Sequence, residues 1–326
     1  MKLSAIKGYV ALLALAGMAL VPACNDTGDV QDLRDQEQRF FEIYVVSRYP
    51  DAELEQYGLY YMEHRAGTGK SPGPEDWVIV NHVGYEIPED KIFVSYIENV
   101  VKDNNLDPDG VALYGPFKMQ INSQNDGFAE GDSLMKEGGQ ATFLFTSRLG
   151  YGDAGNSVIG PYSSLKYEVE LLEVIPDIEA YEQEKIDTYM DTVVSYDTIN
   201  DPGTGAVMYY MIDEATDGEL ITTDSAVSLA YTGLLLDGRV FDEADSLTPY
   251  EFTMGGEDLI QGWDLGLLRL REGEKARLLI PYQLAYGETG WVESSLRRMP
   301  PYETLLFYID VLKVGGEVDD TGKPSE

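Results

Sequence analysis

Between residues 227 and 313, apolar residues recur at every second position in several short runs, and this pattern constrains the fold more than any other feature of the chain. The clearest runs are at 227–231, 275–280 and 305–311. A period of two is typical of a β-strand that buries one face. Asp237 and Gly238 interrupt the pattern and predict a tight hairpin turn, because glycine accepts the positive φ that such a turn requires.

A short helix is expected between these strands. Asp258 is a candidate N-cap residue, and Ile260, Trp263 and Leu267 then recur at the i, i+3, i+7 spacing of one helix face. An apolar stripe on a helix needs a partner surface, and the strands supply one. The sequence therefore predicts an α+β fold, in which an antiparallel sheet packs on one short helix.

Six short motifs follow one another in this region. In order they are Tyr231-Thr-Gly, Asp237-Gly, Val240-Phe-Asp, Ile260-Gln-Gly-Trp-Asp, Leu284-Ala-Tyr-Gly and Pro300-Pro. Their order and content resemble the FKBP-type peptidyl-prolyl cis/trans isomerases, and the resemblance spans the whole region. It implies an isomerase domain that uses neither a cofactor nor a metal.

The resemblance also implies an apolar pocket for a proline ring. Trp263 would form its floor, Asp242 and the Tyr286 hydroxyl would be its polar groups, and the Ile260 N–H would hold a substrate carbonyl. The residues with expected catalytic roles are Tyr231, Phe241, Asp242, Trp263, Tyr286 and Phe307, and those expected to bind substrate are Tyr250, Leu259, Ile260 and Met299.

Each key residue also has an ordinary structural interpretation. A tryptophan on a helix stripe is a common core residue, an aspartate after a strand often caps a turn, and a buried tyrosine hydroxyl often satisfies a backbone carbonyl. Two features depart from the family pattern. The arginine that often pairs with the pocket aspartate is missing after Asp242, and a long loop places Trp291 and Arg297-Arg298 at the expected pocket rim. We expect this loop to shape substrate preference.

The upstream half contains a weaker copy of the same pattern. Tyr60-Tyr61-Met62 recurs as Tyr209-Tyr210-Met211, and Gly84 recurs as Gly233, both at a spacing of 149 residues. An internal repeat of this length predicts two tandem FKBP-like domains. The expected organisation is a signal peptide at 1–23, a tether at 24–37, a degenerate FKBP-like domain at 38–175, a linker helix and loop at 176–206, an isomerase domain at 207–316 and a tail at 317–326.

The pocket of the first copy is altered. His82 stands at the place of Tyr231, Val94 at that of Asp242 and Phe128 at that of Trp263. The first copy also carries an insertion of about 15 residues, between Phe93 and Phe117. We expect this domain to have a binding or structural role, with weak or no isomerase activity.

A helical stretch precedes each copy. Residues 38–47 place Phe40, Phe41 and Tyr44 on one arc, and residues 178–193 do the same with Tyr181, Ile186 and Tyr189. Such apolar arcs usually face a core, so we expect packing helices in preference to helices that bind a partner.

The N-terminus has the pattern of a secretory signal. Lys2 and Lys7 precede 16 uncharged residues, a span too short for an ordinary transmembrane helix. Leu20–Cys24 resembles a bacterial lipobox, although Pro22 is unusual there and a plain signal peptide is the alternative. Cys24 is the single cysteine of the chain, which excludes an internal disulfide and fits lipid attachment. We therefore expect a lipid anchor in the bacterial cell envelope, on the periplasmic side or in the outer membrane, followed by an acidic flexible tether.

Composition excludes several other functions. The formal net charge of -35 disfavours nucleic-acid binding, which needs clustered basic residues. Two histidines leave little for a histidine-based metal site, and no nucleophile elbow or P-loop motif is present. Two functions stay open. One is a prolyl isomerase whose partners are proline-containing segments of exported proteins, and the other is a non-catalytic FKBP-like peptide-binding lipoprotein in an envelope assembly.

Overall fold

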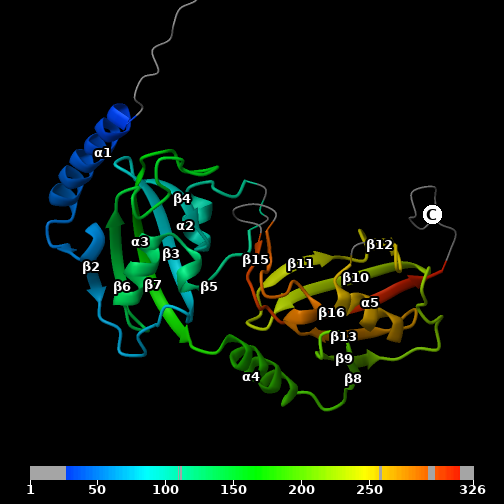
Figure 1. Ribbon diagram of the computed structural model, residues 1–326. Helices are drawn as coiled ribbons and strands as arrows, with labels where there is room; N and C mark the ends of the chain where they lie inside the picture. Colours follow the sequence, from blue (N-terminus) through cyan, green and yellow to red (C-terminus); the bar gives the residue numbers. More distant parts are fainter. Residues whose placement is uncertain (1–26, 109, 111, 257–258, 293–297, 316–326) are drawn as a thin grey trace, which may run out of the picture.

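The computed structural model describes residues 27–108, 110, 112–256, 259–292 and 298–315 of the 326-residue chain. Within these ranges the chain forms two similar α+β units, which helix α4 connects (Figure 1). The expected signal peptide, Cys24, the Asp258 cap, Arg297 and the tail at 317–326 lie outside the described residues.

The first unit is an antiparallel sheet of seven strands in the order β1-β2-β6-β7-β3-β4, with β5 paired to β3. Helix α3 lies across one face of this sheet (Figure 1). The elements are β1 (Glu53–Leu54), β2 (Tyr60–Arg65), β3 (Trp77–Ile87), β4 (Lys91–Ser95), α2 (Glu98–Asp103), β5 (Phe117–Gln120), α3 (Asp126–Leu134), β6 (Gln140–Phe145) and β7 (Ser164–Ile175), with short 3-10 turns at Gln56–Gly58 and Ile121–Ser123.

The second unit repeats this topology, with the strand order β11-β10-β16-β13-β9-β8 and with β12 paired to β10. Helix α5 takes the place of α3. The elements are β8 (Asp197–Asn200), β9 (Val207–Glu214), β10 (Ala226–Leu235), β11 (Val240–Ala244), β12 (Tyr250–Thr253), α5 (Gln261–Gly266), β13 (Lys275–Ile280), the pair β14 (Trp291–Val292) and β15 (Arg298–Met299), and β16 (Leu305–Val314), with 3-10 turns at Leu267–Arg269 and Tyr282–Leu284.

Gly84 and Gly233 hold equivalent places on the central strands β3 and β10. A methyl group on Gly84 would lie 2.7 Å from the Phe93 ring, and one on Gly233 would lie 2.7 Å from the Phe241 ring. Both glycines therefore let an aromatic wall residue lie directly against the strand. The register agrees, because Gly84 pairs with Val94 and Gly233 with Asp242.

The two units differ most in the connection between their fourth and fifth strands, counted along the chain. In the first unit, residues 96–116 and helix α2 connect β4 to β5, whereas residues 245–249 make the same connection in the second unit. This is where the sequence places an insertion. The insertion reaches toward β15 of the second unit (Figure 1).

Helix α1 (Thr27–Arg48) is longer than expected. The sequence predicts a flexible tether up to residue 37, but the helix already begins at Thr27, so this prediction is wrong over 27–37. The acidic charge does not prevent order there, because Glu37 accepts hydrogen bonds from the Ser147 N–H and hydroxyl at 2.6 Å and from the Ser164 hydroxyl at 2.8 Å. Phe41 and Tyr44 are buried as expected, while Phe40 is 63% exposed.

Helix α4 (Ile178–Met190) contacts both units. Its Ile186 packs with Met211, Leu279 and Leu306 of the second unit. One turn earlier on the same face, Glu182 binds the Lys118 ammonium of the first unit at 2.7 Å, and this ammonium also lies 3.1 Å from Glu303 of the second. All three side chains of this ionic cluster are at most 5% exposed. The ionic cluster therefore joins α4 and the two units in a buried contact.

Candidate active site

The site of the second unit is built around Trp263 on helix α5. Two glycines on this helix face the sheet, and a methyl group on Gly262 would lie only 2.3 Å from Ile280. The helix can therefore lie close to the strands, which brings the indole into contact with rings from the sheet. The Tyr231 ring lies edge-on to it at 5.0 Å and the Phe307 ring at 5.1 Å.

More aromatic side chains complete this cluster. The Tyr250 ring lies 6.0 Å from the Trp263 ring, and the Phe241 ring lies 5.6 Å from that of Phe307. Edge-on contacts of this kind fix ring orientation as well as burying apolar surface. Trp263 is only 4% exposed, and its indole N–H has no hydrogen-bond partner among the described residues. The cluster therefore forms a rigid apolar base with one polar group left unsatisfied.

A polar pair stands on the rim of this cluster. The Tyr231 hydroxyl on β10 donates a 2.6 Å hydrogen bond to the Asp242 carboxylate on the neighbouring strand β11. Burial and this carboxylate raise the pKa of the Tyr231 hydroxyl, so it stays protonated and remains a donor. Tyr231 thus orients Asp242.

A small cavity of about 80 Å³ opens beside these residues. It is lined by Leu113, Phe241, Asp242, Tyr286, Trp291, Arg298 and Met299. Four of the residues expected to form a proline pocket are in this set, namely Phe241, Asp242, Tyr286 and Met299. Tyr231, Tyr250, Leu259 and Ile260 pack against the same buried cluster, which contains Trp263 and Phe307. All ten expected site residues therefore lie in one region.

Two described residues of the loop expected at the rim lie there. Trp291 and Arg298 both line the cavity, and the Trp291 ring lies 6.1 Å from that of Tyr286. Ile260 is the N-cap residue of α5, at the end of the helix that carries Trp263. These positions put the polar groups and the rim loop around one opening.

Sequence reasoning missed Leu113. This residue belongs to the insertion of the first unit, yet it packs against the buried cluster of the second. Its sequence context gives no signal for such a role, because the contact depends on how the two units are placed. The resemblance describes one domain at a time and carries no information about a residue supplied by a neighbour.

The equivalent place in the first unit is filled differently. Phe128 on α3 lies edge-on to His82 at 5.5 Å and to Tyr167 at 4.8 Å. The second unit's Arg298 lies over the Phe117 ring at 5.3 Å and over the Tyr96 ring at 5.8 Å. Burial, together with the positive charge of Arg298, lowers the pKa of His82 to about 4. At neutral pH His82 is therefore an uncharged core residue.

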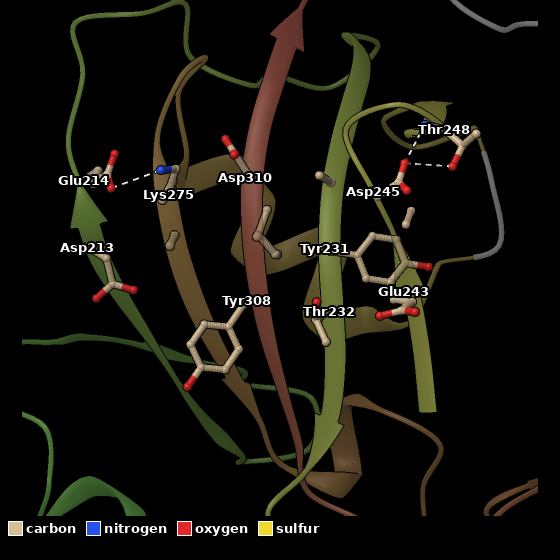
Figure 2. A pocket seen from close by; sticks show the side chains of 14 residues that line it. Asp213, Glu214, Tyr231, Thr232, Glu243, Asp245, Thr248, Lys275, Tyr308 and Asp310 are labelled. Carbon is tan, nitrogen blue, oxygen red and sulfur yellow. Dashed lines mark hydrogen bonds and ion pairs between the residues drawn. The ribbon is translucent and has the colours of Figure 1, made fainter. Parts of the chain in front are cut away.

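A larger hollow of about 610 Å³ lies over the other face of the second sheet (Figure 2). Acidic side chains dominate it, and Lys275 pairs with Glu214 at 3.1 Å (Figure 2). The acids that line it are Asp213, Glu214, Glu243, Asp245 and Asp310. Tyr231 and Tyr308 are the aromatic residues of its lining, and the five carboxylates beside them make the hollow a less suitable surface for an apolar ring than the aromatic cavity. The smaller aromatic cavity is the better candidate for proline.

The described residues contain no group of three or more His, Cys, Asp or Glu side chains placed to hold a metal ion. Among the described helices, none is both long and apolar enough to span a bilayer.

Comparison with known proteins agrees with this geometry. The family model described as "FKBP-type peptidyl-prolyl cis-trans isomerase" matches residues 70–172 and 218–312, which together make up more than half of the chain. "FK506-binding protein 1" of Saccharomyces cerevisiae is 39% identical over 107 residues, which cover 32% of this chain and 90% of that protein. Human "Peptidyl-prolyl cis-trans isomerase FKBP2" is 42% identical over 85 residues, 26% of this chain and 57% of that protein.

Among solved structures, FkpA from Escherichia coli is 27% identical with a TM-score of 0.37, and the match covers 46% of this chain and 62% of that one. A structure of the three FKBP domains of wheat FKBP73 is 18% identical with a TM-score of 0.32, and the match covers 80% of this chain and 97% of that one. The two matches to the family model fall one in each α+β unit. The chain therefore belongs to the FKBP-type peptidyl-prolyl cis-trans isomerases and is built of two tandem FKBP-like domains.

Proposed function

We propose that the second domain isomerises Xaa-Pro bonds in exported proteins, and that the chain works from a lipid anchor at Cys24. The observation that carries the catalytic part is the ring cluster around Trp263, with the Tyr231–Asp242 pair on its rim. The family match supports the reaction type.

The reaction requires no bond to break. Rotation about an Xaa-Pro bond has a barrier of about 18–20 kcal/mol, because amide resonance is lost at the twisted midpoint. The planar amide is more charge-separated than the twisted one, so an apolar site disfavours the planar form relative to the twisted form. A polar group that binds the twisted amide better than the planar one adds to this effect. Lowering the barrier by about 6 kcal/mol would accelerate rotation by roughly four powers of ten.

The residues divide this work between them. Phe241 lines the cavity and offers the proline ring an apolar surface, and Trp263 and Phe307 belong to the buried cluster against which Phe241 packs. The rim pair of Tyr231 and Asp242 places a fixed negative charge beside that surface, where it interacts differently with the planar and the twisted amide. The Tyr286 side chain lines the same cavity, and its proposed role is to donate a hydrogen bond to a substrate carbonyl.

The first domain is proposed to lack this activity. Val94 stands at the register position of Asp242, so the domain has no carboxylate there. His82 is 7% exposed, and its Nδ1 atom has no hydrogen-bond partner among the described residues. The Arg298 guanidinium covers the Phe117 and Tyr96 rings. A binding or structural role fits these features.

The envelope location rests on the sequence alone. A signal-like segment followed by the lipobox-like Leu20–Cys24 supports lipid attachment. Labelling cells with a fatty-acid analogue and comparing the wild type with Cys24→Ser tests this part. Equal labelling of the two proteins would refute lipid attachment at Cys24.

A protease-coupled assay on an Ala-Leu-Pro-Phe peptide tests the catalytic part. The wild type is compared with Asp242→Ala and Trp263→Leu. We expect clear acceleration by the wild type and at least about a tenfold loss in kcat/KM for both variants, since a tenfold change corresponds to about 1.4 kcal/mol of lost transition-state stabilisation. If the wild type and Leu113→Ala, a variant that enlarges the cavity, both stay at the uncatalysed rate, the second domain is not an isomerase.

The alternative is a non-catalytic peptide-binding protein. One observation favours it, namely that the pocket of the first domain is altered, with Val94 at the register position of Asp242. Peptide binding in an NMR titration, with no acceleration in the protease-coupled assay, would select this function.

A further inference from the structure

We propose that the first domain closes the isomerase pocket of the second by placing Leu113 in it. The segment that does so comprises residues 112–116, here called the plug segment. This inference rests on the proposed function, because it takes the cavity beside Asp242 as the proline pocket. It adds a contact between the domains that holds this pocket shut.

The position of Leu113 carries the first step. Its side chain lines the same cavity as Phe241, Asp242 and Tyr286, and it packs against the buried cluster that contains Trp263. Pockets that bind small molecules usually measure about 300–1,000 Å³. The space left beside Leu113 is about 80 Å³, which cannot admit a proline together with its flanking peptide groups. A substrate must therefore displace the plug segment.

A side chain of the second domain binds the backbone of the plug segment. The Arg239 guanidinium donates hydrogen bonds to the carbonyls of Pro116 at 3.0 Å and Tyr114 at 3.4 Å. Arg239 is itself fixed by Asp237, whose carboxylate accepts from its Nε at 2.8 Å and from its Nη2 at 2.7 Å. A guanidinium held in this way presents its remaining donors in a fixed direction. The hairpin turn of the second domain thus carries a preformed clamp for the segment.

Gly115 gives the plug segment its shape. Its φ of +115° is a conformation that favours glycine, and its N–H donates to the Tyr96 carbonyl at 2.8 Å. A methyl group at this position would also lie 3.0 Å from the Arg239 side chain. The segment is therefore tied to its own domain on one side and to Arg239 on the other.

A reciprocal contact supports the same arrangement. Arg298 of the second domain lines the proline cavity and also lies over Phe117 and Tyr96 of the first domain. Each domain thus places one residue in the aromatic site of the other. The buried ionic cluster of Lys118, Glu182 and Glu303 fixes the domains in the position that makes both contacts possible.

The consequence for binding follows from the population of the open state. If the pocket is open in only a fraction of molecules, the apparent Kd rises by the inverse of that fraction. Weakening the plug should therefore tighten peptide binding without any change in the pocket of the second domain. Isomerase activity should rise in parallel.

The experiment uses the full mature chain and the Ala-Leu-Pro-Phe peptide. The variants are Leu113→Ala, which removes the side chain from the cavity, and Arg239→Gln, which removes the clamp. The matched control is Leu54→Ala, because Leu54 is 62% exposed in β1 of the first domain, a strand that pairs only with β2 among the described strands. Peptide affinity is measured by NMR titration and isomerisation by the protease-coupled assay. Hydrogen exchange at the Gly115 N–H, which donates to the Tyr96 carbonyl, reports loosening of the segment independently of peptide.

We expect at least about a fivefold lower Kd and a similar rise in kcat/KM for both variants, with faster Gly115 exchange in Arg239→Gln. The Leu54→Ala control should match the wild type. Unchanged or weaker peptide binding by Leu113→Ala would overturn the plug, and weaker binding would instead make Leu113 a wall that substrate contacts.

The two proposals can fail separately in this experiment. If both variants bind the peptide more tightly than the wild type does, but no protein accelerates isomerisation, the plug is supported and the isomerase function is refuted. If the wild type clearly accelerates isomerisation and Leu113→Ala has the same rate, the isomerase function is supported and the plug is refuted. If neither the wild type nor Leu113→Ala binds the peptide, the plug as a closure of a peptide pocket is overturned as well.

Discussion

Tyr231 donates a 2.6 Å hydrogen bond to Asp242, and the two residues lie on the neighbouring strands β10 and β11. The tyrosine ring also stands edge-on to Trp263, so a single side chain connects the polar rim to the floor of the cluster. The Asp242 side chain lies at an exposed position, where it would otherwise sample several orientations. The orientation of the carboxylate therefore depends on a hydroxyl that is fixed by aromatic packing.

Replacing Tyr231 by phenylalanine should lower isomerase activity while keeping the fold. The ring stays in place, but Asp242 loses its donor, a change worth about 1 kcal/mol at an exposed carboxylate. We expect kcat/KM for a Xaa-Pro peptide to fall by about three- to tenfold. Tyr308→Phe is the control, because Tyr308 is 47% exposed and lines the acidic hollow on the other face of the sheet. Equal activities of the two variants would show that the bond to Asp242 does not contribute.

Trp263 and Phe128 occupy the same place in the two domains, and matched substitutions separate catalysis from packing. Trp263→Leu and Phe128→Leu each remove part of a buried ring, so each should reduce the free energy of unfolding by about 1–3 kcal/mol. Only Trp263→Leu should reduce kcat/KM, by at least about tenfold. Urea unfolding and the protease-coupled assay measure the two effects. A comparable loss of activity in Phe128→Leu would assign catalysis to the first domain as well.

Much of the fold could be predicted from the sequence, because its signals are local. The alternation at 305–311 gives β16, and Leu305, Phe307, Ile309 and Val311 are all buried. The Asp237-Gly238 turn forms with a Gly238 φ of +91°. The repeat of Gly84 and Gly233 corresponds to two sheets with the same strand order. Period, turn chemistry and repetition are properties of short segments, and they do not depend on how the domains are placed.

The contacts between the domains could not be predicted in this way. Leu113 and Arg298 each contact aromatic side chains of the other domain, and the sequence around each residue does not identify the surface that it contacts. The helix at 27–37 was missed for a related reason. Its composition favours disorder, but Glu37 is held by Ser147 and Ser164, which lie more than a hundred residues away. Long-range contacts therefore decided the points on which local patterns failed.

Asp132 makes the stability of the first domain depend on pH. Its side chain on α3 is fully buried, and neither carboxylate oxygen has a hydrogen-bond partner among the described residues. Burial raises the pKa of this carboxyl well above its usual range, so it is protonated in the folded state under acidic conditions. The unfolded chain ionises from about pH 4 upward, which favours unfolding as the pH rises from that value toward the folded pKa.

In the second domain, Leu267 stands at the position that Asp132 has in the first. The substitution Asp132→Leu therefore gives the first domain the residue of the second. We expect the variant to be more stable than the wild type by about 1–3 kcal/mol near pH 7, with a smaller difference near pH 4. Urea unfolding at the two pH values measures this. Asp103→Leu, at an exposed position of α2, should change stability by less than about 0.5 kcal/mol. A gain for Asp132→Leu that does not vary with pH would refute the titration argument.

Lys118 should hold the two domains together, and its removal tests this. In Lys118→Met, Glu182 and Glu303 lose the ammonium that lies between them at 2.7 and 3.1 Å, and among the described residues Lys185 is the one cation that remains paired with both. Removing one partner of a buried ion pair typically lowers the free energy of unfolding by about 3–5 kcal/mol. The lost contact also joins the domains, so we expect calorimetry to show two thermal transitions in place of one. Lys102→Met is the control, because Lys102 pairs with Glu98 on the surface and should contribute less than about 1 kcal/mol. A single transition at the wild-type temperature in Lys118→Met would show that other contacts hold the domains in register.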